Sequence, residues 1–350
     1  MALGPVMVDL HGHEMEAEER DMLLHPLVGG VILFSRNYAS AGQVAALTRM
    51  IHELRQPHLL IAVDHEGGRV QRFRDGFSNL PACAAIGQAG TNAKSNQLAE
   101  EAGWLMAAEL LAVGVDLSFA PVLDIGGNIS EVIGDRAFHT DPERIFQLAH
   151  AYMKGMKQAG MAAVGKHFPG HGSVAEDSHI AVPRDDRDFQ DINMKDLVPF
   201  ERMIEAGLPA LMPAHVIYSK VDKLPAGFSP IWLKQILRKQ LKFQGTIFSD
   251  DLSMAGAEVI GGYPERAEAA MQAGCDMVLA CNNRAGAVEI LDNAAIESSA
   301  ESRSRLIRMH GHFRQNLAQL QQTELWQQRT QRICSLEKEP ELHLGDDETI

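Results

Sequence analysis

Eight short apolar segments alternate with amphipathic, helix-like segments along the chain, and this alternation restricts the possible folds more than any other feature. The apolar segments start at Gly4, Gly29, His58, Val115, Ala162, Ala210, Gly245 and Cys275. Segments that are apolar throughout are typical of parallel strands covered on both faces, and the helices between them supply the crossover connections. Eight such units can close into a barrel. The sequence therefore predicts an α/β fold, a single (β/α)8 barrel of the TIM type, with a doubly wound open sheet as the alternative.

The intervening segments carry helix boundary signals. One predicted helix has Asp141 as its N-cap, Pro142 at its first position and Gly160 as its stop. Another has Ser229 as its cap and Gly245 as its stop. Side chains that accept backbone N–H groups favour helix starts, and glycine favours helix ends.

The chain is predicted to form one catalytic domain over residues 1–335, which includes one or two helices after the last strand, at about residues 284–332. With 45% hydrophobic residues in 350, the chain can bury a large core. Residues 336–350 form an acidic segment that we expect to be disordered, because it is too polar to bury apolar surface.

The excess of acidic over basic residues indicates which kinds of partner the chain can bind. The chain has 46 acidic and 32 basic residues, a formal net charge of −14, which disfavours nucleic acid and anionic membranes as partners. The N-terminus has no basic region followed by an apolar one, and no segment approaches the roughly 20 apolar residues of a membrane span. The four cysteines show no CxxC spacing, which fits reduced thiols. We expect a cytoplasmic monomer that acts on a small molecule.

Charged and polar residues gather just after the apolar segments, where (β/α)8 barrels place their active sites. Any one of them could be a helix cap or a loop ion pair, but their shared position indicates a functional site. They are Asp64, Arg72, Asp124, Arg136, Lys166, His167, His215, Asp250 and Asp251.

These residue types suit glycoside hydrolysis, which needs a carboxylate at the anomeric centre and a proton donor at the leaving oxygen. Asp250 is the candidate nucleophile, since a strand end holds it rigidly. In the segment KHFPGHGSVAEDSH, residues 166–179, His179 is a candidate acid and Asp177 can orient its ring. Charge-assisted hydrogen bonds to sugar hydroxyls could come from Asp64, Arg72, Arg136, Lys166 and His167.

Three other functions fit some of the same residues. A metal-dependent amidohydrolase-type barrel could use His11 and His13, an HxH pair, together with His215. A Schiff-base lyase could use Lys166 if that lysine were desolvated and neutral. A barrel that binds a sugar or peptide without catalysis would not need both Asp250 and the mobile pair of Asp177 and His179.

Four motifs give the chain a family resemblance: AVDHEGGRVQR, KHFPGHGSVAEDSH, LMPAHVIYSKVD and FSDDLSMAGA. In this order they resemble the bacterial β-N-acetylglucosaminidases of glycoside hydrolase family 3, in particular the cytoplasmic single-domain enzymes of peptidoglycan recycling. The likeness extends over roughly residues 4–335.

The resemblance implies roles for individual residues. Asp250 would be the nucleophile, His179 the general acid/base and Asp177 its partner. The substrate would be a non-reducing terminal β-linked N-acetylglucosamine on cell-wall turnover products, cleaved by double displacement without a metal or an organic cofactor. The sugar-binding positions would be Asp64, Arg72, Arg136, Lys166 and His167.

Overall fold

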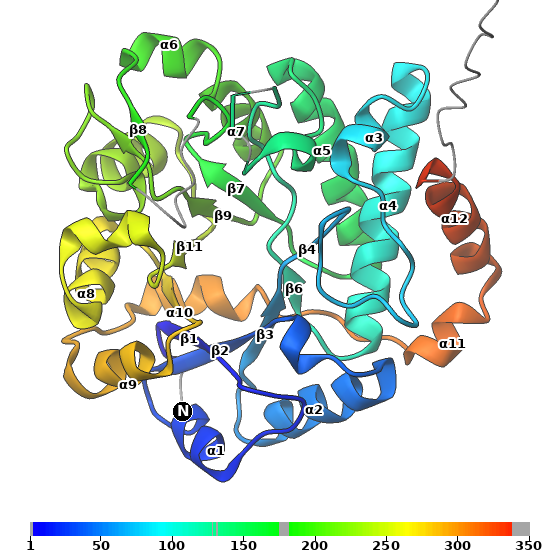
Figure 1. Ribbon diagram of the computed structural model, residues 1–350, viewed down its shortest axis with the longest axis horizontal. Helices are drawn as coiled ribbons and strands as arrows, with labels where there is room; N and C mark the ends of the chain where they lie inside the picture. The colour runs from blue at the N-terminus through cyan, green and yellow to red at the C-terminus, as the bar shows by residue number, and fades with distance from the viewer. Residues whose placement is uncertain (1–2, 128, 131, 175–181, 338–350) are drawn as a thin grey trace, which may run out of the picture.

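The computed structural model describes residues 3–127, 129–130, 132–174 and 182–337. At its centre lies an eight-stranded parallel sheet, and each of the eight predicted apolar segments contributes one strand to it (Figure 1). The strands are β1 (Val6–Asp9), β2 (Val28–Leu33), β3 (Leu60–Val63), β6 (Leu117–Ser118), β7 (Val164–Phe168), β9 (Ala210–Pro213), β11 (Thr246–Asp251) and β12 (Met277–Ala280).

The sheet curls into a barrel. Its order, β6-β3-β2-β1-β12-β11-β9-β7, follows the chain cyclically, as a (β/α)8 barrel requires. The two end strands meet through a parallel bridge between Val122 and Lys166, and the amide of Val164 donates to the carbonyl of Ala120 at 2.7 Å. The prediction of a (β/α)8 barrel is confirmed, and the open sheet is excluded.

Helices surround the barrel, and short two-stranded sheets extend the loops (Figure 1). The small strands are β4 (His65–Gly67), β5 (Val70–Gln71), β8 (Arg184–Asp185) and β10 (Ile217–Tyr218). Apart from short 3-10 turns, the described helices before the last barrel strand are α1 (Ala17–Leu23), α2 (Ala41–Glu53), α3 (Cys83–Gly87), α4 (Asn92–Ala112), α5 (Pro142–Ala159), α6 (Phe189–Met194), α7 (Leu197–Glu205), the π-helix η4 (Ile231–Gln240) and α8 (Tyr263–Ala273).

The predicted helix boundaries were right for α5 and partly wrong for η4. Asp141 accepts the amide of Glu143 at 2.8 Å, and Gly160 ends α5 with a φ of 108°. The η4 helix ends at Gln240 and not at Gly245. The guanidinium of Arg238 donates to the carbonyl of Gly245 at 2.6 Å, so the residues after Gln240 form a turn held by a side chain.

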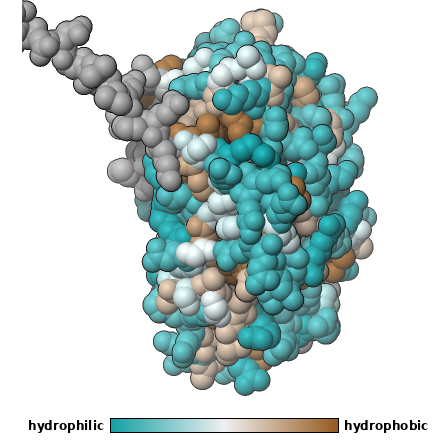
Figure 2. All heavy atoms as spheres, turned by 90° about the vertical axis from the view of Figure 1, so that its right-hand side faces the viewer, coloured by the Kyte–Doolittle hydropathy of each residue, from teal (hydrophilic) through white to brown (hydrophobic). Residues whose placement is uncertain are grey.

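Within the described residues, four α-helices follow the last strand where one or two helical segments were expected: α9 (Arg284–Asn293), α10 (Ala300–Ile307), α11 (Leu317–Gln321) and α12 (Glu324–Cys334). The last two pack on α4, and the indole of Trp326 donates to the buried carboxylate of Glu109 at 2.8 Å. On this face, hydrophilic residues predominate and apolar ones form small separate groups (Figure 2). Most of the predicted acidic tail, residues 338–350, lies outside the described residues.

Among the described residues, no helix combines the length and the apolar character needed to span a bilayer.

Candidate active site

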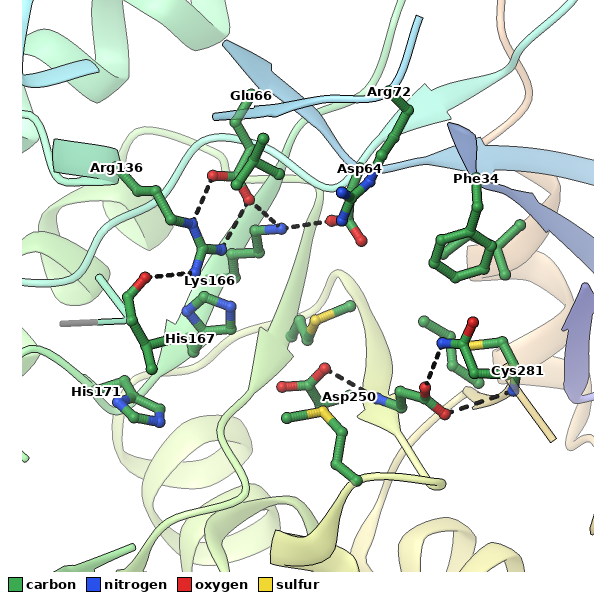
Figure 3. A pocket seen from close by; sticks show the side chains of 18 of the residues that line it. Phe34, Asp64, Glu66, Arg72, Arg136, Lys166, His167, His171, Asp250 and Cys281 are labelled. Atoms are coloured by element: carbon green, nitrogen blue, oxygen red, sulfur yellow. Dashed lines mark hydrogen bonds and ion pairs between the residues drawn. The ribbon is translucent and has the colours of Figure 1, made fainter. Parts of the chain in front are cut away.

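A cavity of about 400 Å³ opens at the carboxyl ends of the barrel strands (Figure 3). Of the eight residues to which the sequence analysis gave a catalytic or sugar-binding role, six line it together: Asp64, Arg72, Arg136, Lys166, His167 and Asp250. The strand-end residue Asp251 lines it as well. Its lining also includes Phe34, Glu66, His171, Met254 and Cys281.

Lys166, from β7, is buried between two carboxylates. Its Nζ lies 2.7 Å from Oδ1 of Asp64 and 2.6 Å from Oε1 of Glu66. Burial favours the neutral amine, but the two carboxylates outweigh burial and raise the pKa of Lys166. A lysine held as a cation is a poor nucleophile toward a carbonyl, so these contacts argue against the Schiff-base alternative.

Glu66 connects Lys166 to Arg136. Two nitrogens of Arg136 donate to the two oxygens of Glu66, both at 2.8 Å, which is the bidentate geometry of a strong ion pair. Burial alone would raise the pKa of Glu66, but Arg136 and Lys166 hold it far below its ordinary value. This carboxylate stays ionised and fixes both cations at the cavity wall.

The sequence analysis assigned no role to Glu66. A signal was present, because Glu66 lies two residues after Asp64 at a strand end. In an extended chain, residues i and i+2 point to the same face. Asp64 and Glu66 could therefore have been paired as two carboxylates on one side of the cavity.

Asp124 fixes the positions of His167 and His171 in the site. Its carboxylate, fully buried, accepts Nδ1 of His167 at 2.7 Å and the backbone amide of His171 at 2.6 Å. Burial raises the pKa of Asp124, but the adjacent His167 outweighs it and the net shift is downward. The ring of His167 is thereby fixed, with Nδ1 committed to Asp124. Asp124 was noted only as a strand-end residue, and its orienting contact requires the fold.

The two adjacent aspartates of β11 have different surroundings. Oδ2 of Asp251 accepts the hydroxyl of Ser253 at 2.7 Å and the side-chain amide of Asn282 at 3.0 Å. Burial raises the pKa of Asp251 despite these hydrogen bonds. Asp250 faces the cavity beside Lys166 and His167, and its Oδ1 accepts the amide of Asp251 at 2.9 Å (Figure 3).

Asp177 and His179 lie outside the described residues. The segment that leads to them is held in place at its start. The hydroxyl of Tyr218 donates to the carbonyl of Gly170 at 2.7 Å. A Cβ at Gly172 would lie 1.9 Å from the carbonyl oxygen of Ile125, so only glycine fits there.

The histidines of the metal-dependent alternative are scattered. His215 is fully buried, with Nε2 at 3.0 Å from the carbonyl of Asp251 and its ring stacked on Phe228. His11 lines a separate small pocket with Arg36, and His13 is exposed. Within the described part of the chain, the ring nitrogens of these three histidines do not gather into a metal-binding group. The proposed metal site at His11, His13 and His215 is therefore wrong.

Comparison with known families matches residues 3–309 to the glycosyl hydrolase family 3 N terminal domain. The chain belongs to glycosyl hydrolase family 3. Membership of the family confirms the resemblance seen in the four motifs, and the chain is accordingly a glycoside hydrolase of the β-hexosaminidase type.

Relatives of this family match nearly the whole chain. The beta-hexosaminidase of Thioalkalivibrio sulfidiphilus is 56% identical over 346 residues, covering 98% of this chain and 99% of the relative. That of Tolumonas auensis is 55% identical over 332 residues, covering 95% and 97%. The crystal structure of NagZ from Neisseria gonorrhoeae in complex with N-trifluoroacetyl-D-glucosamine has a TM-score of 0.90 and 44% identity, covering 96% of this chain and 98% of that one.

Proposed function

We propose that this chain is a retaining exo-β-N-acetylglucosaminidase. Asp250 is its nucleophile, His179 its general acid/base and Asp177 the residue that orients His179. The observation that carries the proposal is the position of Asp250, which lines one cavity with Asp64, Lys166 and His167. The similarity to beta-hexosaminidases and to NagZ supports N-acetylglucosamine as the sugar.

Sugar hydroxyls bind, in this proposal, to Asp64, Arg72, Arg136, Lys166 and His167. Arg72 supports this assignment, because its Nε is buried and has no hydrogen-bond partner within the described residues. A buried donor without an acceptor is costly, and a ligand hydroxyl would satisfy it. The cavity of about 400 Å³ suits a terminal sugar better than an internal segment of a polymer.

The reaction proceeds in two steps. Asp250 attacks the anomeric carbon while His179 protonates the leaving oxygen, which gives a covalent glycosyl-enzyme. His179 then acts as a base and activates a water molecule that releases the sugar with its configuration retained. Neither step needs a metal or an organic cofactor.

The natural substrates in this proposal are cell-wall turnover products, namely N-acetylglucosamine linked to anhydro-N-acetylmuramic acid, with or without a stem peptide. Residues 1–335 act as one catalytic domain, as a monomer in the cytoplasm. The similarity to NagZ over nearly the full chain supports this assignment to peptidoglycan recycling.

Hydrolysis of 4-nitrophenyl N-acetyl-β-glucosaminide tests the activity, and proton NMR of the first-formed sugar tests its stereochemistry. We expect release of nitrophenol that a chelator does not change, with the β-anomer appearing first. The α-anomer as first product would exclude the covalent intermediate. Activity that the chelator removes would exclude the metal-free mechanism.

Arg72→Gln should raise KM about 10- to 100-fold with little change in Tm, because a charged hydrogen bond to the sugar contributes roughly 1.5–3 kcal/mol. The matched control is Arg74→Gln, which removes an exposed arginine that does not line the cavity. Equal kinetics for the two variants would remove Arg72 from the sugar-binding set.

His179→Ala should slow substrates with poor leaving groups far more than activated aryl glycosides, because only the former need protonation of the leaving oxygen. The measurement is kcat/KM for the 4-nitrophenyl glycoside and for the natural disaccharide. Equal losses on both would assign His179 a structural role.

A further inference from the structure

Three side chains that commonly bind metals meet at the end of the barrel opposite the active site. His52 lies in the last turn of α2, His58 two residues before β3, and Asp116 directly before β6. Residues that precede parallel strands lie at the amino end of a barrel, whereas Asp64, which follows β3, lies at the catalytic end. The cluster is therefore separate from the sugar-binding cavity.

The carboxylate of Asp116 is held rigidly. Its Oδ2 accepts the amide of Ile61 at 2.8 Å, and its Oδ1 accepts the amide of Gly311 at 2.9 Å. The side chain is wholly buried. A histidine ring nitrogen lies near each of its two oxygens.

One histidine of the cluster makes only a long hydrogen bond to Asp116, and the other makes none. Nε2 of His52 lies 3.4 Å from Oδ2 of Asp116, and Nε2 of His58 lies 3.7 Å from Oδ1. Ordinary N–H···O bonds span about 2.7–3.2 Å. Nε2 of His58 is buried and makes no hydrogen bond within the described part of the chain.

Those distances fit ligands that share an ion. Two ligand atoms about 2.0–2.1 Å from a tetrahedral zinc ion lie about 3.4 Å from each other. The three ligand atoms of this cluster all lie within 4.8 Å of one another, so small side-chain shifts suffice to enclose an ion. The neighbouring His310 is no ligand, since its two ring nitrogens face the carbonyls of Ile307 and His58.

We propose that His52, His58 and Asp116 bind a divalent transition-metal ion, best Zn²⁺, at the base of the barrel. Two imidazoles and one carboxylate suit zinc, whereas Mg²⁺ and Ca²⁺ prefer oxygen ligands. The side chains of His52 and His58 are 18% and 29% exposed, which leaves an ion a path from solvent and water a place in its coordination shell. The ion fastens α2, β3 and β6 together and, through the amide of Gly311, the segment after α10. Its role is structural.

The full-length protein, stripped with a chelator and dialysed, is titrated with Zn²⁺ while its Tm is followed. Because the ion binds only the folded chain, Tm should rise by roughly 2–5 °C at saturation. Co²⁺ should give the intense visible absorption of a tetrahedral ion, with one equivalent bound at this site. Hydrolytic activity in chelator should equal that of the metal-loaded protein, because the cluster lies away from the cavity.

His52→Gln and His58→Gln should each lose the rise in Tm, the cobalt absorption and one equivalent of bound metal. Their activity in chelator should match that of the unmodified protein. The control His150→Gln removes an exposed histidine of α5 and should keep all three responses. Absence of the cobalt absorption from the unmodified protein overturns the proposal. So do unchanged metal responses in both variants, which would place the ion elsewhere, for example at the histidines of the cavity.

Discussion

Asp250→Asn should lower kcat for hydrolysis on the order of 10⁴-fold or more, because the amide cannot form the covalent intermediate. The fold should be unaffected, since asparagine has the same shape and its side-chain oxygen can still accept the amide of Asp251. The measurement is kcat with the 4-nitrophenyl glycoside, beside Tm. Azide added to Asp250→Gly should restore turnover and give a glycosyl azide of the opposite anomeric configuration.

The neighbouring aspartate supplies the matched control. Asp251→Asn weakens hydrogen bonds from Ser253 and Asn282 inside the protein, so its main effect should be on Tm. Its kcat should fall much less than that of Asp250→Asn. If Asp251→Asn proved the slower enzyme with an intact fold, and azide failed to rescue Asp250→Gly, the nucleophile would be Asp251.

The barrel and the position of its site could be predicted because both depend on simple periodic features. Buried parallel strands must be apolar throughout, and the strand ends must then carry the polar groups that face the cavity. Asp64, Lys166 and Asp250 therefore followed from their places at the ends of apolar segments. These placements needed no knowledge of side-chain contacts.

The remaining features depend on side-chain contacts that form only in the folded chain. The end of η4 is set by Arg238 reaching forward to Gly245 and not by the glycine itself. Glu66 acquires its role only when the fold brings it to Arg136, 70 residues away in the chain. The same holds for Asp116, whose partner His52 lies 64 residues before it and whose partner Gly311 lies 195 residues after it.

Glu66→Gln should destabilise the protein by about 3–5 kcal/mol, because removing one member of a buried ion pair leaves the other charge uncompensated. Arg136 loses its bidentate partner, and Lys166 keeps only Asp64. The measurement is the free energy of unfolding in urea at pH 7. As a control, Glu100→Gln breaks a surface pair with Lys154 and should cost at most about 1 kcal/mol.

The loss of unfolding free energy in Glu66→Gln should depend on pH in one direction only. The folded pKa of Glu66 lies below its unfolded value of about 4.3, so its contribution is complete above that value and declines as pH falls. The difference in stability between the unmodified protein and Glu66→Gln should therefore be constant near neutrality and shrink in acid. A difference that grew in acid would contradict the assignment of Glu66 as an ionised partner.

The double variant Glu66→Gln/Lys166→Met separates the stabilising role of this network from its role in catalysis. Removing the anion together with one of its cations leaves less uncompensated charge, so the combined loss of stability should be smaller than the sum of the two single losses. Activity should not recover in the same way, because Lys166 is itself a proposed ligand of the sugar. Recovery of both together would mean that Lys166 serves only to balance Glu66 and Asp64. The basic residues left to bind the sugar would then be Arg72, Arg136 and His167. Loss of stability that is fully additive would mean that Glu66 acts mainly through Arg136.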